Sequence, residues 1–208
     1  MSQRKLTADF IFDGKHLFPK AVLIIDKDGV VVDCISAADA SLLKEAEYYK
    51  GILSPGLVNA HCHLELAHLH KKIPEHTGLV DFLLNVIQHR SETIENIQQA
   101  ALEADRFMYE HGIVAVGDIS NTDHTVHIKK NSTIYYHSFV ETIGFNPTLA
   151  EQQLHDALEI QKTFQHNNLS ASIVPHAPYS VSKELFKLIN TLPQNILSIH
   201  NQEADAEN

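Results

Sequence analysis

From residue 52 onward, short apolar runs alternate with longer stretches in which apolar residues recur every three or four positions. The short runs predict buried strands and the longer period predicts amphipathic helices. We expect strands at 52–59, 114–119, 133–141, 170–175 and 196–200, and helices at 80–89, 93–110, 149–165 and 183–191. These five strand and helix steps indicate an α/β fold with parallel strands.

The first 51 residues have a different pattern. Short strand candidates at 9–12, 21–26 and 30–35 are separated by the turn-forming pairs Asp13-Gly14 and Asp28-Gly29. Asp-Gly between two β-branched runs predicts a hairpin. We therefore expect two regions, 1–51 and 52–208, with a polar, Ala-rich connection before the second.

The segment 55–65 carries the first candidate chemistry. It is an apolar run that ends in His61-Cys62-His63. Because side chains alternate along a strand, His61 and His63 lie on one face, where both imidazoles can bind a single divalent cation. Cys62 then lies on the opposite face, which argues against its being a third ligand.

Two more predicted strands end in histidine. His176 follows the apolar run 172–175, and His200 follows 196–199 with a carboxylate, Glu203, three residues later. Barrels of alternating strands and helices gather their chemistry at the C-terminal ends of the strands. We therefore expect a partial TIM-like barrel with about five of its eight strands, because a full barrel needs about 250 residues.

These motifs resemble the amidohydrolase superfamily, in its metal-dependent deaminase and chlorohydrolase-like branch, which includes aminofutalosine, adenosylhomocysteine and guanine deaminases. The resemblance rests on PGLVNAHCHLEL at 55–66, VPHAPYS at 174–180 and SIHNQE at 198–203. It implies that His61, His63 and His200 are metal ligands, that His176 contacts substrate, and that Glu203 carries protons to a substrate nitrogen. It also implies that the N-terminal segment is part of a small β-sandwich.

The same resemblance implies a further His and a further Asp, which would come after Asn208. The Asp would both touch the metal and act as general base. The sequence therefore looks like the N-terminal part of a larger enzyme, and we expect the 208 residues alone to be weakly active or inactive. A partial barrel also leaves an open strand edge and an apolar interior, which favour a homo-oligomer.

Other polar residues near the predicted strand ends are candidates for the substrate site. Glu65 and Asp118 lie just beyond two strand ends, and we expect them to be substrate contacts and not ligands. His68 and His70 repeat the His-x-His spacing, but no apolar strand precedes them, so we place them at the surface or the pocket rim.

Composition narrows the function classes. The net charge of −10 disfavours a nucleic-acid partner, because phosphate binding requires clustered Lys and Arg. No apolar run reaches the roughly 18 residues of a membrane span. Two cysteines, Cys34 and Cys62, fall in different predicted regions, which argues against a disulfide and fits a cytoplasmic protein.

The expected chemistry is hydrolysis of a C–N bond other than a peptide bond. One divalent metal, zinc in preference to iron, would lower the pKa of a bound water to about 7 and supply hydroxide. This hydroxide would deaminate an amino-heterocycle or nucleoside-like small molecule. The alternatives are a cyclic-amide hydrolase or chlorohydrolase of the same superfamily, and a catalytically inactive metal-binding remnant.

Overall fold

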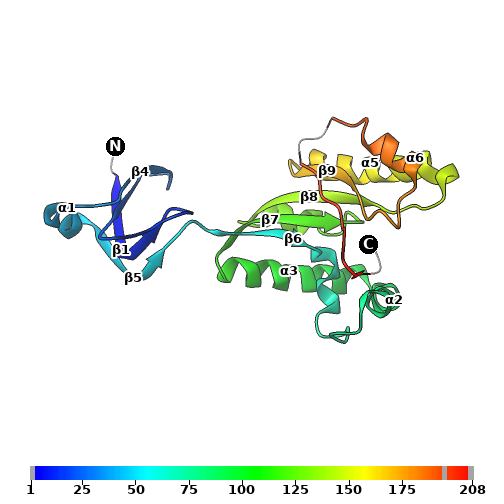
Figure 1. Cartoon of the computed structure of the whole chain (residues 1–208), viewed down its shortest axis with the longest axis horizontal. Helices are drawn as coiled ribbons and strands as arrows, with labels where there is room; N and C mark the ends of the chain where they lie inside the picture. The colour runs from blue at the N-terminus through cyan, green and yellow to red at the C-terminus, as the bar shows by residue number, and fades with distance from the viewer. Residues whose placement is uncertain (1–2, 194–195, 206–208) are drawn as a thin grey trace. The chain divides into compact units, whose positions relative to one another are not determined.

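The computed structural model describes residues 3–193 and 196–205. The chain divides into two compact units, Met1–Gly56 and Leu57–Asn208 (Figure 1). The boundary expected from the sequence, between residues 51 and 52, falls inside a strand of the first unit. In the described residues, no helix is long and apolar enough to cross a membrane.

The first unit is built on one five-stranded sheet. Its elements are β1 (Arg4–Phe12), β2 (Leu17–Pro19), β3 (Val22–Ile25), β4 (Val31–Ile35), α1 (Ala40–Glu45) and β5 (Glu47–Leu53). Strand β1 pairs antiparallel with β2 and β3, and parallel with β5. The Asp28-Gly29 hairpin is present, because β3 pairs antiparallel with β4. The β-sandwich implied by the resemblance is not seen, since the described residues of this unit contain a single sheet.

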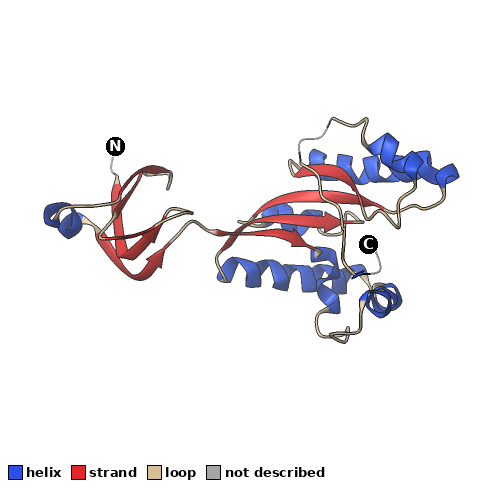
Figure 2. Cartoon of the chain, viewed as in Figure 1, coloured by secondary structure: helices blue, strands red, loops and turns tan. Residues whose placement is uncertain are grey.

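The second unit is built on four parallel strands in the order β6-β7-β8-β9 (Figure 2). The strands are β6 (Leu57–Cys62), β7 (Ile113–Ser120), β8 (Tyr135–Thr142) and β9 (Ser170–Pro175). The helices are η1 (Leu64–Leu69), α2 (Leu79–His89), α3 (Ile94–Glu110), α4 (Val126–Asn131), η2 (Pro147–Leu149), α5 (Ala150–His166) and α6 (Lys183–Ile189). Four of these helices, α2, α3, α5 and α6, match the predicted ones closely.

The helices begin and end at residues with the expected chemistry. The side chain of Thr93 accepts a hydrogen bond from Asn96 N at the start of α3, and Ser182 does the same for Leu185 N at α6. Gly112 follows α3 with a φ of 81°, a conformation that glycine adopts without steric cost. Gly112 therefore marks the end of α3.

The two faces of the sheet have different neighbours. Residues at alternate positions pack with the helices in two clusters, one around Val116 and Tyr136 with α3 and α4, and one around Val140 and Ile173 with α5 and α6. The intervening positions form a separate small cluster, Ile119, Phe139 and Val174, on the other face. This second face carries the polar residues described below.

Two strand predictions are wrong. The strand expected at 52–59 is divided between β5 and β6, because Pro55 and Gly56 interrupt the pairing. Residues 196–200 form no strand. Ile196, Leu197 and Ile199 remain 44 to 59% exposed, so little apolar burial offsets the cost of ordering a strand there. In the part of the second unit that the structure describes, the sheet therefore has four strands and not five, and these do not close into a barrel.

Candidate metal centre

His61 and His63 face each other at the C-terminal end of β6. Their Nε2 atoms are 3.2 Å apart. The register between β6 and β7 shifts between Asn59 and Cys62, so a bulge spans Ala60 and His61. Bulges change the direction of neighbouring side chains, and this one lies where His61 turns toward His63. Cys62 packs with the cluster between sheet and helices, away from both rings.

Gly117 on β7 accommodates the bulge. A Cβ atom at this position would lie 2.7 Å from the carbonyl oxygen of Ala60 and 2.9 Å from the Phe139 ring. Both contacts are shorter than packed atoms tolerate. The glycine therefore lets the bulged backbone of β6 approach β7 closely.

His200 reaches the same place from the C-terminal segment. Its backbone N–H donates to the carbonyl of His176 at 2.7 Å, which joins this segment to the end of β9. The His200 ring centroid lies 4.8 Å from that of His61 and 5.4 Å from that of His63. The ligand atoms of these three histidines all lie within 4.8 Å of one another.

Glu141, at the end of β8, completes a second group with His176 and His200. Its Oε1 is 3.3 Å from His200 Nε2, and its Oε2 accepts a hydrogen bond from Asn121 Nδ2 at 3.0 Å. Among the described residues, neither Glu141 Oε1 nor His200 Nε2 has a well-aligned hydrogen bond, although both atoms are buried. Buried polar atoms are normally paired, so two unsatisfied ones that face each other favour a bound cation.

The pKa shifts of His61, His63 and Glu141 agree with this interpretation, whereas that of His200 favours its charged form. Burial and the neighbouring His200 lower the pKa of His61, and burial lowers that of His63 to about 4. The contact with Glu141 raises the pKa of His200. Burial opposes ionisation of Glu141, but contacts with its hydrogen-bonding neighbours outweigh it and lower the pKa. Neutral imidazoles and an ionised carboxylate are the forms that bind metal ions.

Nitrogen ligands from three histidines, with the Glu141 carboxylate beside them, fit a divalent metal such as zinc or iron. The donor set and the unsatisfied atoms at its centre are therefore compatible with the metal that the sequence motifs imply.

His176 and Glu203 lie beside the histidines. His176 Nδ1 is 2.6 Å from Ser180 Oγ, and burial lowers its pKa. Glu203 Oε1 is 3.4 Å from His200 Nδ1, and Glu203 Oε2 accepts a hydrogen bond from the Tyr179 hydroxyl at 2.8 Å. All the residues expected from the histidine-bearing motifs thus come together.

Open space adjoins this group on both sides of the C-terminal segment. A pocket of about 570 Å³ is lined by Glu203 with the segment from Ile73 to Leu79 and Phe82. Another of about 580 Å³ is lined by Tyr179, Pro178 and residues of α2. A small molecule could therefore approach Glu203 and Tyr179.

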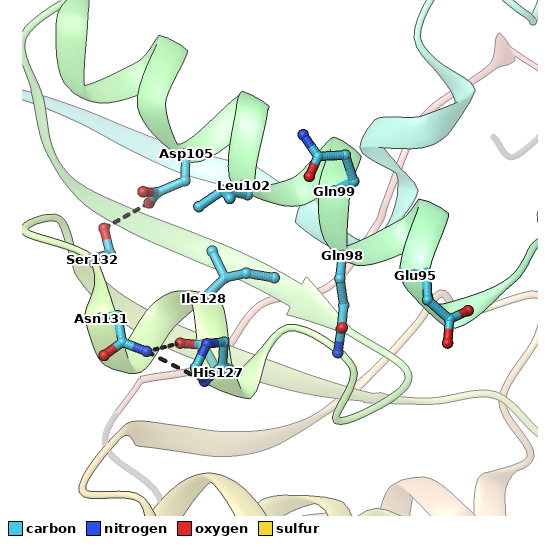
Figure 3. Close-up of a pocket in the computed structure, with 9 residues that line it drawn as sticks. All are labelled: Glu95, Gln98, Gln99, Leu102, Asp105, His127, Ile128, Asn131 and Ser132. Atoms are coloured by element: carbon cyan, nitrogen blue, oxygen red, sulfur yellow. Dashed lines mark hydrogen bonds between the residues drawn. The ribbon is translucent and has the colours of Figure 1, made fainter.

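A third pocket, of about 350 Å³, lies between α3 and α4 (Figure 3). Its walls include Gln98, Leu102, Asp105 and His127, and none of the residues of the metal group lines it. In Figure 3, Asp105 accepts a hydrogen bond from Ser132, at 2.6 Å. This pocket is separate from the chemistry described above.

Glu65 and Asp118 occupy positions that differ from the expected one. Glu65 is 4% exposed and its carboxylate accepts hydrogen bonds from the backbone of Asn121 and Thr122. Asp118 has no exposed surface and forms an ion pair with Lys129 at 2.6 Å. Both carboxylates are engaged inside the protein, so the structure gives no support to direct substrate contact, and we do not propose it further.

Glu141 is the site residue that the sequence prediction missed. It stands at the end of the predicted strand 133–141, the position that drew attention to Glu65 and Asp118. The same positional argument, applied to this third strand, would have identified it.

The similar proteins of known function are deaminases. No known protein-family profile matches the chain. An adenosine deaminase of Helicobacter pylori is 28% identical over 162 residues, which are 76% of this chain and 39% of that protein. A 5'-deoxyadenosine deaminase of Methanococcus vannielii is 30% identical over 205 residues, 90% of this chain and 46% of that protein. The chain spans about half the length of the curated relatives it matches.

Solved structures show the shared fold. Aminofutalosine deaminase of Helicobacter pylori, in complex with methylthio-coformycin, superposes with a TM-score of 0.78 at 23% identity over 96% of this chain and 51% of that one. Guanine deaminase of C. acetobutylicum, with bound guanine, gives a TM-score of 0.68 at 16% identity over 91% of this chain and 50% of that one.

Proposed function

We propose that the chain is a relative of the amidohydrolase-superfamily deaminases over about half of their length, and that it contains a metal-dependent deaminase site. The observation that carries the proposal is the convergence of His61, His63 and His200 within 4.8 Å. Glu203 and His176 lie beside them, as the chemistry requires.

His61, His63 and His200 would hold one divalent cation, zinc in preference to iron. Such a cation supplies an activated water at neutral pH. The carboxylate of Glu141 lies against His200, where it orients the ring and adds negative charge near the cation. The proposed ligands thus come from β6 and the C-terminal segment, and their support comes from β8.

Glu203 would carry a proton to the ring nitrogen of the substrate, so that negative charge does not accumulate there. Its hydrogen bond from Tyr179 fixes the carboxylate beside the pockets. His176, held by Ser180, would contact the substrate with its remaining ring nitrogen. Glu203 would thus transfer the proton, and His176 would orient the substrate.

We propose an adenosine-like substrate, because the curated relatives are named adenosine and 5'-deoxyadenosine deaminases. A cyclic-amide hydrolase or a chlorohydrolase would use similar groups, and their products distinguish them. Deamination releases ammonia, whereas ring opening or dechlorination does not.

The metal site is tested by elemental analysis of the purified chain and of three variants. We expect close to one zinc or iron per wild-type chain, and loss of the metal in His61→Ala and His200→Ala. His70→Ala is the matched control, because His70 is exposed and belongs to the second His-x-His pair outside the site. Equal metal contents in all four proteins would contradict the proposal.

The reaction is tested by ammonia release from adenosine and 5'-deoxyadenosine over long incubations with the zinc-loaded chain. We expect ammonia release that Glu203→Gln abolishes while the metal content is retained. Release no faster than with Glu203→Gln would favour the inactive metal-binding remnant over the deaminase.

A further inference from the structure

We propose that the buried pair Asp118 and Lys129 is a positioning device that fixes the backbone after His63 and so holds the metal-binding histidines in place. The inference rests on the proposed metal centre. It assigns a function to two fully buried charges that the proposed chemistry does not use.

Asp118 joins β7 to the segment that leaves β6. Its Oδ1 accepts a hydrogen bond from the backbone N–H of Leu64 at 2.7 Å. Leu64 is the residue directly after His63, and it is 1% exposed. The carbonyl of His63 in turn accepts a hydrogen bond from Leu66 N at 2.9 Å. Both the carbonyl and the N–H of the peptide group that joins His63 to Leu64 are thus held.

Lys129 fixes the other oxygen of the carboxylate. Its Nζ lies 2.6 Å from Asp118 Oδ2 and donates hydrogen bonds to Ser120 Oγ at 2.9 Å and Ser138 Oγ at 2.8 Å. An ammonium group has three donors, and all three have partners here. Nζ also lies 4.5 Å from the centroid of the Phe164 ring, a cation–π distance. The lysine therefore holds Asp118 in one orientation.

Charge burial argues for a role beyond stability. The side chains of both residues have 0% exposure. Removing two charges from water costs more free energy than a well-packed apolar pair would, so ion pairs of this kind are poor devices for stability alone. What an apolar pair lacks is an acceptor for the Leu64 N–H. The carboxylate supplies this acceptor on the side of the sheet opposite the histidine rings.

Asp118 and Lys129 thus support the metal site without being ligands themselves. Ligands after β6 keep their direction only if the backbone beneath them is fixed, and outer partners of this kind typically change metal affinity by 10- to 100-fold. We therefore expect loss of the acceptor to weaken metal binding even in a folded protein.

The test compares two double variants that differ only in the acceptor. Asp118→Ala/Lys129→Met removes both charges and the acceptor, whereas Asp118→Asn/Lys129→Met removes both charges and keeps an amide oxygen for Leu64 N–H. Co²⁺ is the probe, because its visible absorption reports ligand geometry, and circular dichroism establishes that each variant is folded. Asp105→Asn is the control, since Asp105 joins α3 to Tyr136 at 2.7 Å without touching the His63 segment.

We expect Asp118→Ala/Lys129→Met to bind Co²⁺ about 10- to 100-fold more weakly, with an altered spectrum. Asp118→Asn/Lys129→Met should stay close to wild type, and Asp105→Asn should lower stability without changing the spectrum. Unchanged affinity in Asp118→Ala/Lys129→Met, or an equal loss in Asp105→Asn, overturns the inference.

Two further results keep the inference separable from the metal proposal. If wild-type protein binds no Co²⁺, the metal centre itself is wrong and the inference falls with it. If Asp118→Ala/Lys129→Met does not fold, Asp118→Val/Lys129→Met decides, because it removes the acceptor for Leu64 N–H but fills the space of the carboxylate. A loss of Co²⁺ affinity of about tenfold or more is expected there, and unchanged affinity overturns the inference.

Discussion

The Glu141 carboxylate lies 3.3 Å from Nε2 of His200 and so connects the end of β8 with the C-terminal segment. His200 belongs to two groups of potential metal ligands, one with His61 and His63 and the other with Glu141 and His176.

Glu141→Gln should weaken zinc binding by about tenfold or more, because it removes the negative charge beside His200. Competition with a chromogenic chelator measures the affinity. Glu151→Gln, on the exposed start of α5, is the control and should bind like wild type. Equal affinities for the two variants would contradict a role for Glu141 at the metal.

Glu65→Ala should lower the free energy of unfolding by about 1–3 kcal/mol, because the amides of Asn121 and Thr122 lose their acceptor. Urea denaturation measures the change. Glu151→Ala serves as the exposed control. A loss of the same size in this control would contradict a specific stabilising effect of the Glu65 hydrogen bonds.

Gly117→Ala should destabilise the second unit by about 1–3 kcal/mol, because its methyl group would press against the Ala60 carbonyl. The bulge at Ala60 and His61 must then shift. Urea denaturation that gives the wild-type free energy would show that the backbone has room for the methyl group.

The first unit should lose stability in acid through Asp9. Hydrogen bonds from the Tyr48 hydroxyl and the Gly51 amide lower the pKa of this carboxyl below 3.8. Its contribution is therefore complete above that value and is lost as the pH falls through the lower, folded-state pKa. Unfolding measured between about pH 5 and pH 2 should depend less steeply on pH in Asp9→Asn. An unchanged slope would contradict this assignment.

The protein should form oligomers in solution. In the described residues, β6 and β9 are the edges of a four-stranded sheet, and Leu57 and Val58 on β6 are 59% and 68% exposed. Unpaired strand edges with apolar residues favour pairing with another chain. Light scattering coupled to size-exclusion chromatography measures the mass, and a monodisperse monomer would count against this prediction.

Strand-end positions predicted much of the site. His61, His63, His176 and His200 each follow an apolar run, and the structure brings all four rings together. Local periodicity also predicted α3 and α5, whose apolar faces pack on the sheet. These features depend on residues that are close together in the sequence, and for this reason the local pattern predicts them.

The remaining features depend on contacts between distant segments. Asp118 has a carboxylate at a strand end, but Lys129 on α4 neutralises it inside the protein. The bulge at Ala60 and His61 depends on Gly117 in the neighbouring strand. Apolar composition predicted a strand at 196–200, yet a strand also needs a continuous partner, and composition does not supply one.

The hydrogen bond from His200 to the His176 carbonyl gives the proposed cation a second function. His61 and His63 lie two residues apart at the end of β6, whereas His200 belongs to a segment without strand pairing at 196–200. A cation held by all three would fasten that segment to the sheet as a crosslink. Loading the metal and ordering the C-terminal segment would then be one event, so the affinity for the ion would include the free energy of closing that loop.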